Sequence, residues 1–557
     1  MIDNIINRIG SFFVHGEGEQ LIFTSISFWI FFTTVYAVFT VVYKQYTLKN
    51  LFLFAVSIFF YWKASGLFFL LLLTTCIYDY FIARAIPRQQ NPAIRKLLCG
   101  ISVVVNLGLL CYFKYAYFFT DSYNQIFHTE HKVFNYFAHW GNSLFDGTPF
   151  RVDKILLPVG ISFYTFKTIS YTIDVYKGRM EPVKNFVDYA FYLSFFPQVL
   201  IGPIVRARDF MPQARQPFSL SKYQFGLALF MILNGLFKKM VFGDYLAVNF
   251  IDIIYSNPLL YSGFENFFAV IAYSLQVYLD FSGYTDVAIG ICLLMGYKLK
   301  PNFNSPYKAR NVGEFWKRWH ISLSTWLQDY LYIPLGGNKK GTAASYIIIA
   351  ILTIFISLML NATWLLWFMG SLAVVLLMVS FISPGIRNAV NTNINLMITM
   401  LLGGLWHGAT LNFIVWGGLN GIGIVVYKFW KRISPYEKIK TLPVHFWKVF
   451  NTFIFISATR VFFRAEDMDQ ANEVFKKIWN DLHMSQLVPI LEHYWREFAM
   501  MTIAFIVHWL PTDVKWQYKK IFIKAPVWAK IMIVVLTVML IFQTMSTELK
   551  PPIYFSF

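Results

Sequence analysis

Charged residues are scarce in this sequence: Asp, Glu, Lys and Arg make up 14% of its 557 residues, against about 25% in an average soluble protein. So few charges cannot solvate a soluble chain in which 57% of residues are hydrophobic and 20% aromatic. The composition also excludes intrinsic disorder and a small disulfide-stapled scaffold. With a mean hydropathy of +0.51, the sequence predicts an all-α polytopic membrane protein. Segments between the apolar runs are too short for further domains, so residues 1–557 are expected to form one membrane domain.

Cysteine is equally rare, with four residues in the chain. All four lie in apolar runs without CxxC or Cys/His spacing, so we expect small core side chains and neither a disulfide nor a zinc site. The sequence also lacks a Gly-x-Ser-x-Gly elbow, Walker and Rossmann glycine patterns and HExxH. His128 and His131 are three residues apart without a clear third ligand, so no metal is expected. The cysteines are Cys76, Cys99, Cys111 and Cys292.

Acidic residues are outnumbered by basic ones, 29 to 48, which gives a formal net charge of +19. Cytoplasmic loops of membrane proteins collect Lys and Arg, and no basic stretch follows a nucleic-acid-binding pattern, so no nucleic-acid partner is expected. The basic loop Arg84–Lys96 is predicted to be cytoplasmic, and the more acidic segments Thr120–Lys154 and Glu466–Glu497 extracytoplasmic. Both chain ends then lie outside, and the polar first 20 residues predict no cleavable signal peptide.

Apolar runs of about 20 residues, the length that crosses a bilayer, recur along the chain. Shorter runs indicate re-entrant or interfacial helices, because broken backbone at membrane depth survives only inside protein. We therefore predict about 11 spans plus several such pieces. The predicted spans are Leu21–Tyr43, Leu67–Ile86, Leu97–Phe119, Phe186–Val205, Tyr223–Phe242, Phe264–Gly296, Tyr346–Phe368, Leu396–Tyr427, Phe446–Phe463, Phe498–Leu510 and Val527–Phe542. The shorter runs are Leu51–Trp62, Ile155–Tyr176, Tyr245–Tyr255 and Ile321–Leu335.

One histidine lies in a long uncharged stretch: His407, in LLGGLWHGAT at residues 401–410. An ionisable group at the centre of a span costs at least about 2.5 kcal/mol unless it is paired or hydrated, and imidazole exchanges a proton near neutral pH. His407 is therefore a candidate general base acting on a hydroxyl, and Gly403, Gly404 and Gly408 leave room for a ligand or another backbone. The alternative is a structural histidine bonded to a helix carbonyl, with the glycines serving helix packing.

A second histidine, His320, follows a segment rich in Trp, Lys and Arg. Helical spacing predicts that Trp316, Trp319 and His320 share one face, with Lys317 and Arg318 turned elsewhere. The alternative is an ordinary interfacial belt of aromatic and basic residues.

The basic segment Lys298–Arg318 is opposed by one acidic residue, Glu314. Its charge suits a phosphorylated donor such as coenzyme A or a carrier protein's phosphopantetheine arm, although a positive-inside loop has the same composition. The candidate donor-binding residues are Lys308, Arg310, Trp316, Lys317, Arg318 and Trp319.

Two aspartates, Asp280 and Asp286, lie within the apolar run Phe264–Gly296. They either pair with a buried Arg or backbone donors, or order a catalytic histidine and line a polar passage. Together with Trp406 they are candidate tunnel-lining or supporting residues, and Arg206 is a candidate partner. The other histidines are predicted to lie mostly at the surface: His15, His128, His131, His139, His445, His483, His493 and His508.

Seven motifs occur in an order that resembles the membrane-bound O-acyltransferase (MBOAT) family, specifically its bacterial alginate O-acetyltransferase branch. The resemblance spans nearly the whole chain, and the relatives that transfer D-alanine to teichoic acid share several of the motifs. The motifs are LPVGISFYTF (157–166), FFPQVLIGPIVR (195–206), DFSGYTD (280–286), FWKRWHISLSTW (315–326), GLWHGA (404–409), RVFFRA (460–465) and PIYFSF (552–557).

The resemblance implies helices around a central tunnel in which two histidines meet. The family's invariant catalytic histidine matches His407, and its second characteristic histidine matches His320. The expected reaction moves an acetyl group from a cytoplasmic thioester to an extracytoplasmic hydroxyl of an exopolysaccharide or cell-wall glycan. Acetyl-CoA is the expected donor, no cofactor is expected to be bound, and the expected location is the bacterial inner membrane.

Because the acceptor in this branch can be a partner's serine, and the chain has no soluble domain to grip a polymer, we expect an extracytoplasmic acetyltransferase partner. Two alternatives to acetyl transfer stay open. One is D-alanyl transfer from a carrier protein toward teichoic acid. The other is a transporter that uses the buried histidines and aspartates as a relay, although the hydropathy shows no paired inverted halves.

Overall fold

The computed structural model describes residues 21–144, 150–544 and 550–553, and the described residues form helices and loops without a strand. Six helical segments are long and apolar enough to cross a membrane, and three shorter apolar helices accompany them. This confirms an all-α polytopic membrane protein, while the number of crossings stays a prediction. The predictions for residues 1–20 and for the end of the last motif, residues 554–557, lie outside the described residues.

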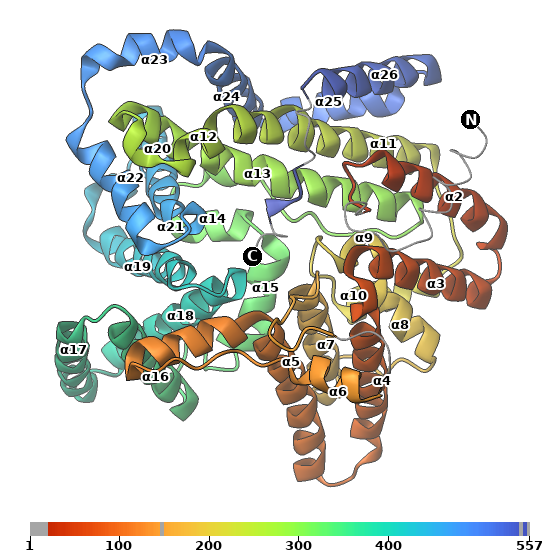
Figure 1. Ribbon diagram of the computed structural model, residues 1–557, viewed down its shortest axis with the longest axis horizontal. Helices are drawn as coiled ribbons and strands as arrows, with labels where there is room; N and C mark the ends of the chain where they lie inside the picture. The colour runs from red at the N-terminus through yellow and green to blue at the C-terminus, as the bar shows by residue number, and fades with distance from the viewer. Residues whose placement is uncertain (1–20, 145–149, 545–549, 554–557) are drawn as a thin grey trace.

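The helices form successive groups along the chain (Figure 1). The first comprises α2 (Ile26–Val42), α3 (Tyr46–Ser65), η1 (Gly66–Phe68), α4 (Phe69–Ala85), η2 (Ile86–Arg88), α5 (Pro92–Phe127), α6 (Tyr136–Leu144), α7 (Ile161–Tyr176), α8 (Phe186–Ser194), α9 (Phe196–Val199) and α10 (Ala207–Ala214). The central group comprises α11 (Lys222–Leu236), η3 (Phe237–Asp244), η4 (Ala247–Ile251), α12 (Asp252–Ser256), η5 (Pro258–Leu260), α13 (Gly263–Leu294), η6 (Pro306–Lys308), α14 (Val312–Arg318), α15 (Ile321–Leu327) and η7 (Gln328–Tyr332).

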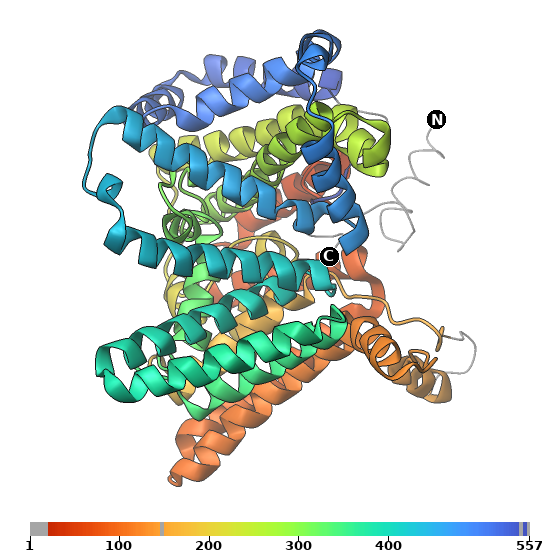
Figure 2. The ribbon, with the colours of Figure 1, turned by 90° about the vertical axis from the view of Figure 1, so that its left-hand side faces the viewer.

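The remaining helices flank this centre, and a side view shows the groups as layers (Figure 2). They are α16 (Ala343–Met359), α17 (Thr363–Ile382), α18 (Pro384–His407), α19 (Leu411–Ile433), η8 (Pro435–Glu437), α20 (Leu442–Thr459), α21 (Val461–Arg464), α22 (Met468–Asn480), η9 (Met484–Gln486), α23 (Leu487–His493), α24 (Trp495–Trp509), α25 (Thr512–Lys524) and α26 (Val527–Thr544).

The central pair of helices packs through glycines. A Cβ atom at Gly235 of α11 would lie 2.5 Å from the carbonyl oxygen of Gly283 on α13, so the two backbones meet directly. The sequence predicted a span at Tyr223–Phe242 and a separate shorter run at Tyr245–Tyr255. This division is wrong, because Lys222–Ser256 is one continuous helical segment. Two π-helical stretches, η3 and η4, carry the helix through this region, which hydropathy does not reveal.

The predicted span Phe186–Val205 is also wrong, because the chain breaks after Ser194 and again after Val199. Pro197 lacks the N–H that would bond the carbonyl of Leu193, and it disfavours helical backbone at the residue before it. The broken pieces are buried, as non-helical backbone at membrane depth requires.

Two further predicted spans are each divided between two helices. Tyr346–Phe368 turns at Asn361, which adopts a left-handed conformation with φ +47°. Leu396–Tyr427 is divided at residues 408–410 into α18 and α19, which lie side by side (Figure 1). Glycine permits this approach, because a Cβ atom at Gly404 would lie 2.2 Å from the carbonyl oxygen of Phe413. His407 is consequently the last residue of a helix that ends inside the protein.

Two predictions about burial are wrong. Cys111 is exposed on α5, whereas the other three cysteines are buried; in a membrane protein an outward-facing apolar residue contacts lipid rather than water. His508 is not a surface residue: it is 4% exposed at the end of α24, and its Nε2 accepts a hydrogen bond from the backbone N–H of Tyr307 at 3.2 Å.

Candidate active site

The two predicted histidines meet in the interior of the protein. The ring centroids of His320 and His407 are 6.4 Å apart, and the two residues are 0% and 3% exposed. They come from the start of α15 and the end of α18. The structure therefore brings together two residues that no local pattern connects.

His320 occupies a sharp turn between two short helices. α14 ends at Arg318, Trp319 is extended, and His320 has a left-handed backbone with φ +43°. The prediction that Trp316, Trp319 and His320 share a helical face is therefore wrong. A non-glycine residue in this conformation is strained by roughly 1–3 kcal/mol, so surrounding contacts must hold it there.

Asn302 supplies those contacts. Its side-chain oxygen accepts hydrogen bonds from the N–H of Ser322 at 3.0 Å and from the Ser322 hydroxyl at 2.9 Å. Its backbone carbonyl accepts from the N–H of Ile321 at 2.9 Å. These bonds satisfy the first amides of α15 and fix the direction in which His320 enters the helix. The sequence analysis missed Asn302, which has no distinguishing pattern around it.

Lys114 holds the end of α18. Its Nζ donates to the carbonyl oxygens of Trp406 at 2.7 Å and His407 at 3.2 Å, and the neighbouring Tyr115 hydroxyl donates to Leu405 at 2.8 Å. The last carbonyls of a helix lack intrahelical partners and favour a cation. Lys114 was missed, although a single lysine inside the predicted span Leu97–Phe119 is a signal that could have found it.

Aromatic rings enclose both imidazoles. Trp406, Trp416 and Phe463 lie with ring centroids 5.0, 5.0 and 5.5 Å from that of His407. Phe281 and Trp406 lie 4.7 and 6.1 Å from His320. Trp406 thus contacts both histidines, and the rings leave little space for bulk water between them.

A cavity of about 90 Å³ borders His407, a volume that corresponds to about three water molecules. Its walls include Lys114, Trp406 and the segment 157–163 that leads into α7. His320 is not among its lining residues. His407 is therefore buried but lies at the wall of a pocket, and the passage across the membrane that the family resemblance implies stays a prediction.

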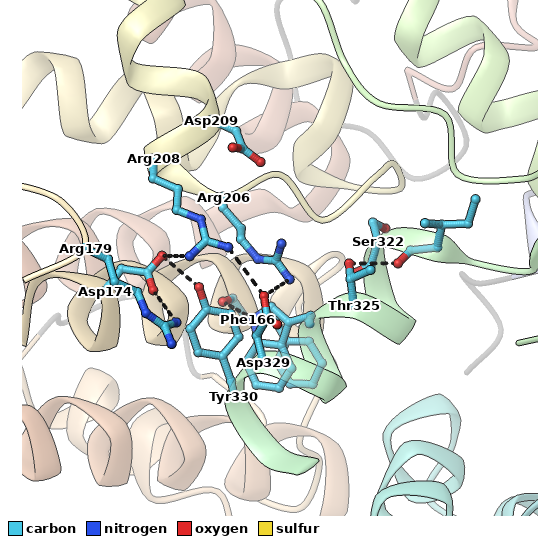
Figure 3. Close-up of polar contacts among 12 residues, drawn as sticks. Phe166, Asp174, Arg179, Arg206, Arg208, Asp209, Ser322, Thr325, Asp329 and Tyr330 are labelled. Carbon is cyan, nitrogen blue, oxygen red and sulfur yellow. Dashed lines mark hydrogen bonds and ion pairs between the residues drawn. The ribbon is translucent and has the colours of Figure 1, made fainter. Parts of the chain in front are cut away.

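The helix that follows His320 is anchored by a cluster of charged residues (Figure 3). Arg206 and Arg208 both pair with Asp329 of η7, at 3.0 and 3.4 Å. The buried Asp174 on α7 accepts a hydrogen bond from the hydroxyl of Tyr330 at 2.8 Å. Arg206 thus pairs with Asp329, an acid that was not among its expected partners, and the cluster ties α15 and η7 to α7 and α10.

Of the two predicted donor-binding tryptophans, Trp319 is buried and Trp316 is partly buried. Trp319 is 3% exposed and lies under the guanidinium of Arg460, 4.3 Å from its carbon to the ring centroid. The Nε1 of Trp316 donates to Asn420 at 3.3 Å, and its ring contacts Trp416 at 5.6 Å. Trp316 therefore reaches the wall around His407 through Trp416.

The predicted basic residues differ in their partners. Arg310 and Arg318 both pair with Glu314, at 3.1 and 2.8 Å, and Lys308 donates to the carbonyl of Leu510 at 2.6 Å. Lys317 is exposed. Within the described part of the chain, Lys317 has no ion pair.

Lys515 joins this basic cluster and was not predicted. Its Nζ donates to the hydroxyl of Ser305 at 3.0 Å, beside the loop that carries Lys308. Lys515 lies in α25, outside the candidate spans. Burial lowers the pKa of Lys515 to about 8, and the positive charges of Lys308 and Lys238 act in the same direction.

The two predicted aspartates pair with lysines of the π-helical stretch η3. Asp280 lies 2.5 Å from Lys239, and Asp286 lies 2.7 Å from Lys238. The expected partner of these aspartates was an Arg or a backbone donor, and the cation beside each is a Lys. Their role in ordering a catalytic histidine or lining a passage stays a prediction. Asp280 also accepts the backbone N–H of Ile553 at 3.1 Å, which anchors the C-terminal segment against α13.

Among the described residues, no group of three or more His, Cys, Asp or Glu side chains is placed to hold a metal ion. The site brings together two imidazoles, a lysine and a wall of aromatic rings.

Comparison with known proteins shows the family to which this all-helical membrane protein belongs. The chain belongs to the membrane-bound O-acyltransferase family, whose sequence model matches residues 180–383. The probable alginate O-acetylase of Pseudomonas putida is 34% identical over 451 residues, covering 79% of this chain and 77% of that protein. The peptidoglycan O-acetyltransferase of Helicobacter pylori is 32% identical, covering 78% and 74%.

More distant relatives include the teichoic acid D-alanyltransferase of Bacillus subtilis, 26% identical over 52% of this chain and 63% of that protein. The protein is thus a multi-pass membrane enzyme, an O-acyltransferase.

Proposed function

We propose that the protein moves an acetyl group from cytoplasmic acetyl-CoA to a hydroxyl on the outer side of the bacterial inner membrane, in the O-acetylation of an exopolysaccharide or cell-wall glycan. The observation that carries this proposal is the buried pair of His320 and His407 beside a cavity. The names of the more similar relatives, an alginate O-acetylase and a peptidoglycan O-acetyltransferase, support acetyl rather than D-alanyl transfer.

In the proposed reaction His407 accepts the proton of the acceptor hydroxyl, and the hydroxyl oxygen attacks the thioester carbonyl. The new C–O bond forms the ester, the C–S bond breaks, and the coenzyme A thiolate takes up the proton from His407. His320 orients the thioester or stabilises charge on its carbonyl oxygen. The aromatic wall around both imidazoles limits water, which protects the acyl group from hydrolysis.

Donor docking is proposed at the basic cluster around Lys308, Lys317, Arg318 and Lys515. The phosphates of coenzyme A attract cations, and Arg and Lys are the usual phosphate-binding side chains. Since Arg318 already shares Glu314 with Arg310, the exposed Lys317 is the most available charge. The acceptor is expected to arrive from the opposite side, carried by an extracytoplasmic acetyltransferase partner.

The test is transfer of radiolabel from acetyl-CoA in membranes that contain the full-length protein and an acceptor. His407→Ala should lower transfer by at least about 100-fold, the usual contribution of general acid–base catalysis, while insertion and expression are retained. His445→Ala is the matched control, because His445 is exposed on α20. Wild-type transfer by His407→Ala would refute the proposal, and label accepted only from a D-alanyl carrier protein would replace it with the D-alanyl alternative.

A further inference from the structure

A groove of about 900 Å³ lies at the surface of the protein between α11, α25 and α26. Helix α26 lies at the edge of the molecule, alongside α11 and α25 (Figure 1). The groove is remote in sequence from both histidines and shares no lining residue with the cavity beside His407. The groove is therefore distinct from the candidate site of acyl transfer.

Close packing on one side of the groove fixes its shape. Helix α25 sits directly on α11, where a Cβ atom at Gly226 would lie 3.2 Å from the carbonyl oxygen and a side-chain methyl of Ile523. The rings of Phe230 and Phe522 meet at 5.6 Å. Apolar side chains such as Phe225, Leu229 and Val535 line the space between this contact and α26.

The length of the groove matches one leaflet of a bilayer. Its lining residues on α26 run from Val527 to Val535, which is about 12 Å of helix at 1.5 Å per residue. The hydrocarbon core of a bilayer is about 30 Å thick, so one leaflet contributes about 15 Å. The groove therefore accommodates acyl chains from one side of the membrane only.

Three basic residues line the groove. Lys222, Lys524 and Lys530 are among its lining residues, and no Asp or Glu is found among the described residues that line it. The Nζ of Lys530 donates to the carbonyl of Ile523 at 2.9 Å and so ties α26 to α25. Lys222 and Lys524 are exposed, and neither forms an ion pair in the part of the chain that the structure describes.

We propose that this groove binds one anionic phospholipid, with its acyl chains along α26 and its phosphate against Lys222 and Lys524. A groove open to the bilayer is filled by hydrocarbon, and a pair of unneutralised lysines at the level of the headgroups selects a negative lipid. Both lysines belong to segments with the basic character of cytoplasmic loops, which places the lipid in the inner leaflet. The bound lipid would fill the space between α26 and the body of the enzyme.

Native mass spectrometry of the full-length protein, released from nanodiscs of equal parts phosphatidylglycerol and phosphatidylcholine, tests the proposal. The wild type should retain one phosphatidylglycerol with about 30-fold preference over phosphatidylcholine, since each of the two lysines contributes about 1 kcal/mol toward anionic lipid. The double variant Lys222→Glu and Lys524→Glu should lose this preference. The variant Leu229→Trp, which fills the groove, should reduce retention of either lipid.

Lys520→Glu is the matched control, because Lys520 is exposed on the same helix as Lys524 and does not line the groove. It should keep the wild-type preference. Equal retention of the two lipids by the wild type, an unchanged preference in the double variant, or an equal loss in the control would each overturn the proposal. Each variant is first shown to be monodisperse by size exclusion, so that misfolding is not counted as lost binding.

Discussion

At the scale of single residues, the histidine pair depends on neighbours that do no acid–base chemistry. Lys114 satisfies the carbonyl oxygens of Trp406 and His407, and Asn302 holds the turn at His320. A carbonyl left without a partner in the interior costs about 1–3 kcal/mol. The position of each imidazole is therefore set by polar contacts one step away from it.

Lys114→Met is expected to lower the rate of acyl transfer at saturating donor by about tenfold or more, because the end of α18 loses its cationic partner and His407 shifts. Donor affinity should be unchanged, since Lys114 lies on the His407 side of the site and away from the basic cluster. Initial rates over a range of acetyl-CoA concentrations separate kcat from KM. Lys132→Met, at an exposed loop lysine, serves as the control. A change confined to the KM for acetyl-CoA would contradict this role.

At the scale of helices, the glycines of the His407 motif serve packing, as one of the two sequence interpretations held. Gly404 on α18 faces Gly417 on α19, and a Cβ atom at Gly408 would lie 2.0 Å from the ring of Phe413. These close approaches allow the two helices to run side by side and end α18 at His407. The glycines thus serve helix packing, and the same packing sets the position of the His407 imidazole.

Gly404→Ala is expected to destabilise the detergent-solubilised protein by about 1–3 kcal/mol, the usual cost of adding a methyl group to a filled interface. The added Cβ would lie 2.2 Å from a backbone carbonyl, which cannot rotate away. Thermal unfolding measures the effect. Gly100→Ala on α5, where nothing lies within 4 Å of the added atom, should leave the midpoint almost unchanged. Similar unfolding midpoints for the two variants would show that the contact between α18 and α19 tolerates the added methyl group.

The sequence predicted helices such as α13 and α26 within a few residues, because their apolar runs have polar or charged ends. It did not predict the division of Leu396–Tyr427 into α18 and α19, since residues 408–410 are uncharged and the turn depends on the contact between Gly404 and Phe413. The sequence did indicate the two histidines: His407 is an ionisable residue in a long apolar stretch, and both histidines match family motifs. Lys114 and Asn302 were not indicated, because a side chain that bonds a distant backbone leaves no local pattern.

At the scale of the whole molecule, basic loops and the acidic stretch Glu466–Glu497 lie at opposite ends of α13. The basic segments 206–215, 298–318 and 515–524 touch one another: Gln213 accepts the backbone N–H of Lys298 at 2.8 Å, and Lys515 donates to Ser305 at 3.0 Å. The acidic stretch predicted to lie outside meets the opposite end of α13, where the N–H of Gly263 donates to the carbonyl of Asp481 at 3.1 Å. Segments assigned to opposite sides by charge are thus separated by the length of α13.

This arrangement makes the direction of acyl transfer testable with single cysteines on a Cys111→Ala background, because the other three native cysteines are buried. Lys132→Cys should react with a membrane-impermeant maleimide in intact cells, and Lys317→Cys only after permeabilisation; both lysines are exposed. Since Lys317 belongs to the proposed donor cluster, labelling it from outside would place that cluster away from cytoplasmic acetyl-CoA. That result would leave the histidine pair intact but remove the proposed source of its acyl group, because charged thioesters do not cross the bilayer core unaided.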